Sequence, residues 1–335
     1  MSISGYTAGS CPNKYSSLGS VFKEFSKPAK TTFRKPGAWE ISGDDVSKTT
    51  SFFLPHSKYG TDDLIQFDTV NALFDPTSTN YQRHRLQPKA AGTALVVLNN
   101  RYVYYNAYMT PDIILYDLDL DTVVQKLSLP SGTNYHGTSE YSVGLQTDID
   151  LARDKANNAV WVMYTSERNN GNLVLSRLDE LSLSIKNTYH TNYQKYDIEN
   201  AFIICGVLYT VNPVGIINSS FDTETGMTRD LSVNLRTDPY GFQFTSMNYF
   251  PVDEKLYSWT DQGEAIKYSL DFIQPTTEMA VTKDEEVITL ELETTTRNRF
   301  CERDGRRYQV DEYLVINCDG FKSKSKYSIW PRFSG

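Results

Sequence analysis

Residues Gln146-Thr147-Asp148-Ile149-Asp150-Leu151-Ala152 carry a strict alternation of acidic and apolar side chains. This pattern predicts a β-strand, because successive side chains on a strand point to opposite faces. Asp148 and Asp150 would then share one face, about 6–7 Å apart, and repel each other by roughly 2.5 kcal/mol. If that face is buried, a proton, a basic side chain or a metal ion must offset the charge. Otherwise the face is exposed to solvent.

Short strands continue on both sides of this stretch. Leu95–Leu98 and Tyr102–Tyr105 flank Asn99-Asn100, and Asn tolerates the positive φ that a two-residue hairpin turn requires. With the runs at 113–116 and 123–127 they predict a four-stranded meander. The same order recurs in three later sets of runs, at 148–151, 159–164, 173–177 and 184–189, then 202–205, 207–211, 217–221 and 228–233, then 247–250, 256–259 and 265–270.

A related turn follows the third strand of each unit, at positions 67, 116, 177, 221 and 268, with gaps of 49, 61, 44 and 47 residues. A degenerate repeat near 50 residues with four strands a unit predicts an all-β, five-bladed β-propeller. The last unit lacks a fourth strand, so we expect an N-terminal strand to complete it. The segment 71–86 is expected to be the least structured.

Four regions follow from this pattern. They are an N-terminal arm with the first-blade strands (1–91), the remaining blades (92–273), a linker (274–299) and a small Cys-containing, disulfide-stapled extension (300–335).

The net charge of −8 and a pI near 5.1 argue against nucleic-acid binding. No apolar run approaches the roughly 18 residues of a membrane span. No signal peptide is visible either, which suggests a fragment of a longer precursor or an incomplete start.

The block Asn200-Ala201-Phe202-Ile203-Ile204-Cys205-Gly206-Val207-Leu208-Tyr209, together with 147–152, resembles the olfactomedin domain family. Supporting pieces occur in family order, among them Tyr116-Asp117-Leu118 and Lys255-Leu256-Tyr257-Ser258-Trp259. The resemblance covers about residues 11–272. It implies a five-bladed propeller, secretion and a Cys11–Cys205 disulfide. Cys301 and Cys318 would then form a second bridge, and Asn218 in Asn-Ser-Ser is a candidate glycosylation site in an inter-strand turn.

The resemblance also implies Ca2+ in the central channel. Its ligands would be the side chains of Asp150, Asn200 and Asn248 and the backbone carbonyls of Ala201 and Met247. Relatives carry Asp where this chain has Asn248, which removes one negative charge from a site that prefers several carboxylates. We therefore expect a weakened calcium site. A monovalent ion or a neutral Asp–Asn cluster are the alternatives.

Asp148 is the residue expected to restore the charge missing at Asn248, because it would share the strand face of Asp150. The resulting interpretation is a secreted, non-enzymatic module of the extracellular matrix or of cell adhesion. It would bind extracellular or cell-surface proteins, and we expect a monomer, since no heptad pattern is present. The rival interpretation is a propeller glycoside hydrolase whose channel carboxylates are Asp148, Asp150 and either Glu140 or Asp117.

Overall fold

The computed structural model describes residues 11, 17–43, 49–180, 182–236, 238 and 241–273, and the backbone of 300–303 and 306–309. The chain divides into two compact units, Met1–Pro275 and Thr276–Gly335. In the second unit, β20 (Phe300–Arg303) pairs antiparallel with β21 (Arg306–Gln309). Cys318 lies outside the described residues, and so does its predicted bridge to Cys301.

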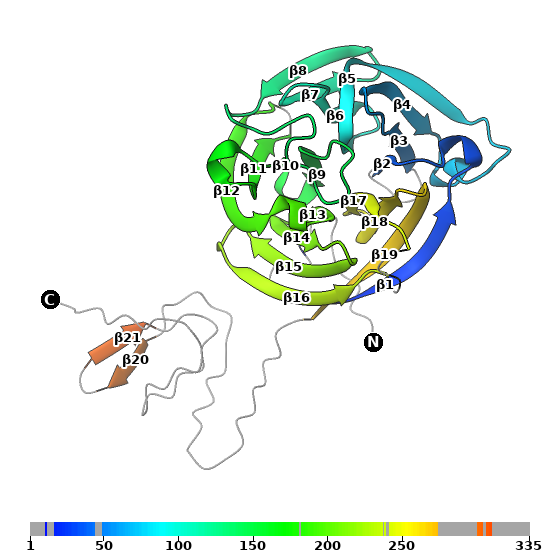
Figure 1. Cartoon of the computed structure of the whole chain (residues 1–335). Coiled ribbons are helices and arrows are strands. Elements are labelled where there is room, and N and C mark those ends of the chain that lie inside the picture. Colours follow the sequence, from blue (N-terminus) through cyan, green and yellow to red (C-terminus); the bar gives the residue numbers. More distant parts are fainter. Residues whose placement is uncertain are drawn as a thin grey trace. The chain divides into compact units, whose positions relative to one another are not determined.

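The first unit is built from antiparallel sheets arranged around a centre (Figure 1). Two of them have four strands each, β9 (Asp150–Asp154), β10 (Ala159–Tyr164), β11 (Asn172–Asp179) and β12 (Ile185–Gln194), then β13 (Asn200–Ile204), β14 (Val207–Val211), β15 (Ile216–Asp222) and β16 (Thr228–Asn234). A seven-stranded sheet contains β2 (Gly37–Ser42), β3 (Thr50–Pro55), β4 (Thr61–Phe67), β5 (Tyr81–Leu98), β6 (Tyr102–Ala107), β7 (Asp112–Asp117) and β8 (Thr122–Ser128). The arrangement is all-β and consistent with a propeller.

The remaining sheet confirms the prediction that an N-terminal strand completes the last unit. Its order is β1 (Ser17–Pro28), β19 (Glu264–Ile273), β18 (Lys255–Thr260) and β17 (Phe244–Phe250). β1 pairs antiparallel with β19 along its length, from Ser17 opposite Ile273 to Pro28 opposite Glu264. The first and last strands of the ring are thereby hydrogen-bonded to each other.

The expectation that residues 71–86 are the least structured is wrong over its second half, because β5 begins at Tyr81. The first half of β5 pairs with β4 and its second half with β6. Its beginning is an outer strand on which only His84 and Leu86 turn inward, between exposed neighbours. Such a strand carries little of the apolar alternation by which strands are predicted.

The described helices are single 3-10 turns, η1 (Thr31–Phe33), η3 (Val70–Leu73), η4 (Lys155–Asn157), η5 (Glu167–Asn169) and η6 (Lys195–Asp197). None of the helices in the described ranges has the length and apolar character needed to cross a membrane. The Asn99-Asn100 hairpin is confirmed, since both residues have positive φ between paired Leu98 and Tyr102. The core consists of apolar clusters lying between neighbouring groups of strands.

Candidate central ion site

Five strands meet at the centre of the ring. β2, β5, β9, β13 and β17 contact one another across the boundaries between sheets (Figure 1). β9, β13 and β17 are each the terminal strand of their sheet, so one edge of each pairs with no further strand in the described residues. Backbone carbonyl groups on such an edge are available to a ligand at the centre.

Asp150 is the first residue of β9, one of the central strands. Its carboxylate accepts the N–H of Leu151 at 2.8 Å and the hydroxyl of Tyr141 at 3.2 Å. Asp150 is partly buried. Burial raises the pKa of Asp150 to about 6, although Lys195 opposes the shift.

Asp148 does not lie on the strand face predicted for it. β9 begins at Asp150, two residues later than expected, and Asp148 belongs to the preceding turn. Its carboxylate accepts the backbone N–H groups of Gly137, Thr138 and Ser139 at 2.7, 2.7 and 2.8 Å. These bonds anchor the long β8–β9 loop, so Asp148 is not the residue that replaces the missing charge.

Lys195 is a buried cation that the sequence did not point to. It lies in η6 with 0% exposure, and its Nζ donates to the carbonyls of Thr147, at 2.6 Å, and Asp148. The ammonium also lies 4.4 Å from the centroid of the Tyr141 ring. Burial lowers the pKa of Lys195 to about 8, against the attraction of Asp148 and Asp150. The side chain is therefore mainly charged at neutral pH.

Asn200 joins two of the central strands. It begins β13, is 2% exposed, and donates its Nδ2–H to the carbonyl of Phe244 on β17 at 3.2 Å. Its Oδ1 accepts the N–H of Ala201 at 2.9 Å. The second pair of predicted ligands, Met247 and Asn248, lies on β17. Thus Asp150, Asn200 and Asn248 all belong to strands of the central group.

The donor set fits calcium in kind. Within the described ranges, no three His, Cys, Asp or Glu side chains gather into a metal-binding group. A calcium ion would therefore be held by one carboxylate, from Asp150, by the amide oxygens of Asn200 and Asn248, and by the carbonyls of Ala201 and Met247. All are hard oxygen donors of the type that calcium prefers. When bound, the ion would neutralise Asp150 and link β9, β13 and β17.

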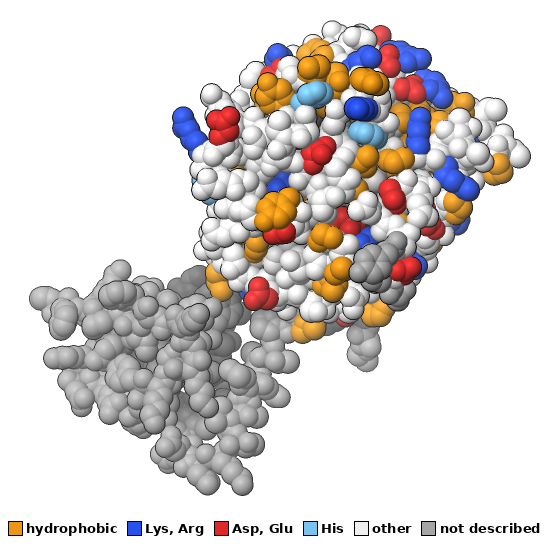
Figure 2. Space-filling model, viewed as in Figure 1, with side chains coloured by type: hydrophobic (Ala, Val, Ile, Leu, Met, Phe, Trp, Pro, Cys, Tyr) orange, Lys and Arg blue, Asp and Glu red, His pale blue; other side chains and the backbone are white. Residues whose placement is uncertain are grey.

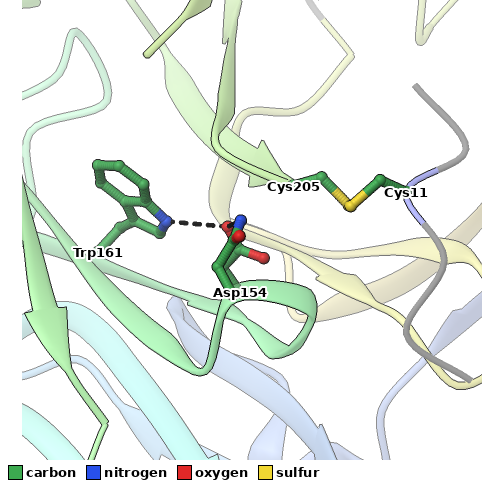
Figure 3. Close-up of a disulfide and its surroundings, with 5 residues drawn as sticks. Cys11, Asp154, Trp161 and Cys205 are labelled. Atoms are coloured by element: carbon green, nitrogen blue, oxygen red, sulfur yellow. Dashed lines mark hydrogen bonds between the residues drawn. A yellow bond between two sulfur atoms is a disulfide. The ribbon is translucent and has the colours of Figure 1, made fainter. Parts of the chain in front are cut away.

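The predicted disulfide is present, at the end of the central strand β13 (Figure 3). Cys11 is bonded to Cys205 across 194 residues, with the Cα atoms 5.6 Å apart. Cys205 and Gly206 form the β13–β14 turn, both with positive φ. Close by, Asp154 accepts the indole N–H of Trp161 at 3.1 Å. The bridge ties the start of the chain to a sheet other than the one that β1 completes.

The family model of the olfactomedin-like domain matches residues 8–275. The chain belongs to the olfactomedin-like domain family. Adhesion G protein-coupled receptor L1 of Homo sapiens is 35% identical over 237 residues, which cover 67% of this chain and 15% of the receptor. Myocilin of Rattus norvegicus is 33% identical over 188 residues, 55% of this chain and 36% of that protein. Myocilin of Felis catus is 38% identical over 173 residues, 50% of this chain and 34% of that protein.

The olfactomedin domain thus spans well under two thirds of these relatives' own lengths. Among solved structures, a glutaminyl cyclase of Myxococcus xanthus superimposes with a TM-score of 0.45 at 9% identity. The superposition covers 76% of this chain and 97% of the cyclase.

Two carboxylates of the rival hydrolase interpretation have structural partners in this olfactomedin domain. Asp117, 2% exposed, closes the β7–β8 turn by accepting two backbone N–H groups of the turn. It also accepts three hydrogen bonds from the Arg101 guanidinium, the shortest at 2.6 Å. The Arg101 guanidinium lowers the pKa of Asp117. Glu140 accepts the backbone N–H of Gln146, within the β8–β9 loop. Both groups stabilise turns.

The position predicted for the glycosylation site is wrong. Asn218 lies inside β15, at a register irregularity in the pairing with both β14 and β16, and not in an inter-strand turn. Its Oδ1 accepts the hydroxyl of Thr210 at 2.9 Å, and Ser220 of the same tripeptide is 6% exposed. The apolar residues around the tripeptide are strand residues, which explains the location. Modification of Asn218 stays a prediction.

Proposed function

We propose that this olfactomedin domain acts outside the cell as a protein-binding module of the matrix or of adhesion, without enzymatic activity. The observation that carries the proposal is a set of exposed hydrophobic side chains on loops at one end of the ring. We call this set the loop face: Tyr59, Met109, Tyr135 and Tyr196, which are 71, 55, 39 and 65% exposed. Aromatic residues and Met are enriched in protein interfaces, and exposed apolar patches often mark them.

Contacts between the loops hold the loop face together. The carbonyl of Lys58 accepts the hydroxyl of Tyr108 at 3.3 Å and the side-chain amide of Gln146 at 3.1 Å. The Tyr108 ring lies 5.3 Å from that of His136. Lys195, next to Tyr196, donates a hydrogen bond to the carbonyl of Thr147. Thr147 belongs to the β8–β9 loop, as do His136 and Gln146. Three separate loops and η6 therefore form one connected surface, which a partner can bind without ordering them first.

The composition of the exposed surface is consistent with a protein as the binding partner. Figure 2 shows one face of the structure, on which small groups of hydrophobic side chains lie among charged, His and other polar ones. Such a mixture resembles the surface of non-obligate protein interfaces. The negative net charge of the chain disfavours nucleic acid as the partner.

We count five blades by dividing the seven-stranded sheet at β5, which belongs to one blade in its first half and to the next in its second. Five apolar clusters support this count, because each lies between successive groups of four strands.

In the proposed mechanism a central calcium ion and the Cys11–Cys205 bridge stiffen the ring, so that the loops keep their positions. Secretion and a monomeric state are part of the same proposal.

Binding of the tagged chain to cultured cells tests this function. Replacing Tyr59 and Tyr196 by Ala should reduce surface binding at least tenfold, since aromatic anchors dominate interface energies. The matched control replaces Leu120 and Met227, which are 65 and 40% exposed on turns at the other ends of outer strands. Full binding by the loop-face variant, or an equal loss in the control, would contradict the proposal. Sugar release from a glycan panel would favour the hydrolase instead.

A further inference from the structure

Tyr108 brings three basic residues together at one side of the loop face. Its hydroxyl donates to the carbonyl of Lys58 at 3.3 Å, and its backbone N–H donates to the carbonyl of Lys89 at 2.8 Å. Its ring lies 5.3 Å from the His136 ring. The Tyr108 ring also packs on Gly60, where φ is +70° and a Cβ atom would lie 2.6 Å from it. The β3–β4 loop, β5 and the β8–β9 loop are therefore held around one tyrosine.

The basic side chains of this region are exposed to solvent beside two hydrophobic members of the loop face. Neither Lys58 nor Lys89 forms an ion pair with a carboxylate of the described residues. Tyr59 and Met109 are 71 and 55% exposed. We call this part of the surface the Tyr108 sector: Lys58, Tyr59, Lys89, Met109 and His136. It combines positive charge that the described chain does not pair with two apolar anchors.

The acidic residues at the start of β4 already have basic partners. Their pairs with β5 are Asp62 with Arg85, at 3.2 Å, and Asp63 with Arg83. Each of these pairs is neutral as a unit, so neither carboxylate offsets the charge of Lys89 further along β5.

The acidic residues of the β8–β9 loop have backbone donors. Asp148 accepts three N–H groups at 2.7–2.8 Å and is 1% exposed. Glu140 accepts the N–H of Gln146. These carboxylates are used to hold the loop together, whereas the ammonium groups of the Tyr108 sector are left for a ligand from outside.

We propose that the Tyr108 sector binds an acidic polypeptide segment of the partner. Lys58 and Lys89 would attract its carboxylates, while Tyr59 and Met109 pack on an apolar residue between them. The inference rests on the proposed function and names the chemistry of the partner. Opposite charges across an interface select the partner and speed its association, and aromatic and Met side chains supply contact area. Because the chain carries a net charge of −8, it attracts an acidic segment only where positive charge is concentrated.

Fluorescence anisotropy of the full chain with labelled peptides tests this inference. The probe is a ten-residue peptide of eight Glu and two Leu residues, and a peptide with Gln in place of Glu should bind at least tenfold more weakly. Replacing Lys58 and Lys89 by Glu should raise the Kd of the acidic probe at least tenfold, because two attractions become repulsions. The matched control, Lys23→Glu with Lys186→Glu, changes the net charge equally at exposed positions of β1 and β12. It should alter the Kd by less than twofold, because salt screens distant charges.

His136→Lys gives an independent measurement in the opposite direction. It adds a permanent positive charge beside Tyr108 and should lower the Kd of the acidic probe about threefold. His190→Lys adds the same charge at an exposed position of β12 and should leave the Kd unchanged. Equal effects of these two substitutions would contradict a site at the Tyr108 sector.

The inference is overturned if the Lys58 and Lys89 variant binds the acidic probe within twofold of the wild type, or if the matched control loses as much. Heparin that binds more tightly than the probe, and is lost with the same two lysines, would assign the sector to a sulfated glycan instead. A chain that binds cells through Tyr59 and Tyr196 but not the acidic probe overturns the inference and leaves the proposed function. Binding of the probe through Lys58 and Lys89 without binding to cells supports the sector and contradicts the proposed function.

Discussion

Replacing Lys195 by Met removes the buried cation beside the central site. The change leaves the carbonyls of Thr147 and Asp148 without their donor and Asp150 without its positive neighbour. Unmet buried acceptors cost about 1–3 kcal/mol, and breaking a buried charge pair costs about 3–5 kcal/mol. We therefore expect the free energy of unfolding to fall by about 3–5 kcal/mol at pH 7.5 in chelator.

The pH dependence separates the charge from the lost hydrogen bonds. The folded-state pKa of Asp150 is already raised to about 6, and it rises further without Lys195. The folded variant therefore holds the Asp150 proton more tightly than the unfolded chain does, and its stability falls as pH rises from about 4 through the folded pKa. At pH 5 Asp150 is protonated, so the loss should shrink to about 1–3 kcal/mol, the cost of the carbonyls.

Urea denaturation followed by tryptophan fluorescence measures both losses. Lys186→Met is the matched control, because it removes a lysine from an exposed ion pair. The Lys186 side chain is 50% exposed, and its Nζ lies 3.7 Å from Oδ2 of Asp179. The substitution should change stability by less than about 1 kcal/mol at either pH. The reasoning is refuted if Lys195→Met behaves like this control at pH 7.5, or if its loss is the same at pH 5 and pH 7.5.

Three further outcomes are expected. Replacing Cys11 and Cys205 by Ser should lower the free energy of unfolding by at most about 5 kcal/mol, the chain-entropy value for a loop of 194 residues, as urea denaturation would show. Arg236→Met leaves the 0%-exposed carboxylate of Glu199 without its two 2.8 Å bonds and should cost about 3–5 kcal/mol, whereas replacing both residues by Met should cost less. Calcium affinity measured by calorimetry should weaken about tenfold between pH 7 and pH 5, because a proton competes for Asp150 with its pKa of about 6.

The periodicity of the strands was enough to predict most of the fold. The regular apolar runs and their turns predicted the later sheets and the completing N-terminal strand, because most of the buried residues on these strands are apolar. The pairing of β1 with β19 followed from the missing fourth strand alone. Outer strands are harder to predict, as the first half of β5 shows, since few of their side chains are buried.

The central residues were predictable only in part. Asp148 and Asp150 alternate with apolar neighbours, which predicts a strand. The alternation is equally compatible with the observed structure, in which Asp148 is buried in a turn and accepts three backbone N–H groups of the preceding loop. Lys195 gave no signal, because its burial depends on carbonyls 47 and 48 residues away in sequence.

Thermal unfolding of the wild-type chain, in calcium and in chelator at the same pH, tests the central ion most directly. Calcium at 100 times its Kd should add about 2.7 kcal/mol, which for a chain of this size raises the melting temperature by roughly 4–5 °C. Identical melting temperatures in calcium and in chelator would contradict a ring stabilised by a central calcium ion.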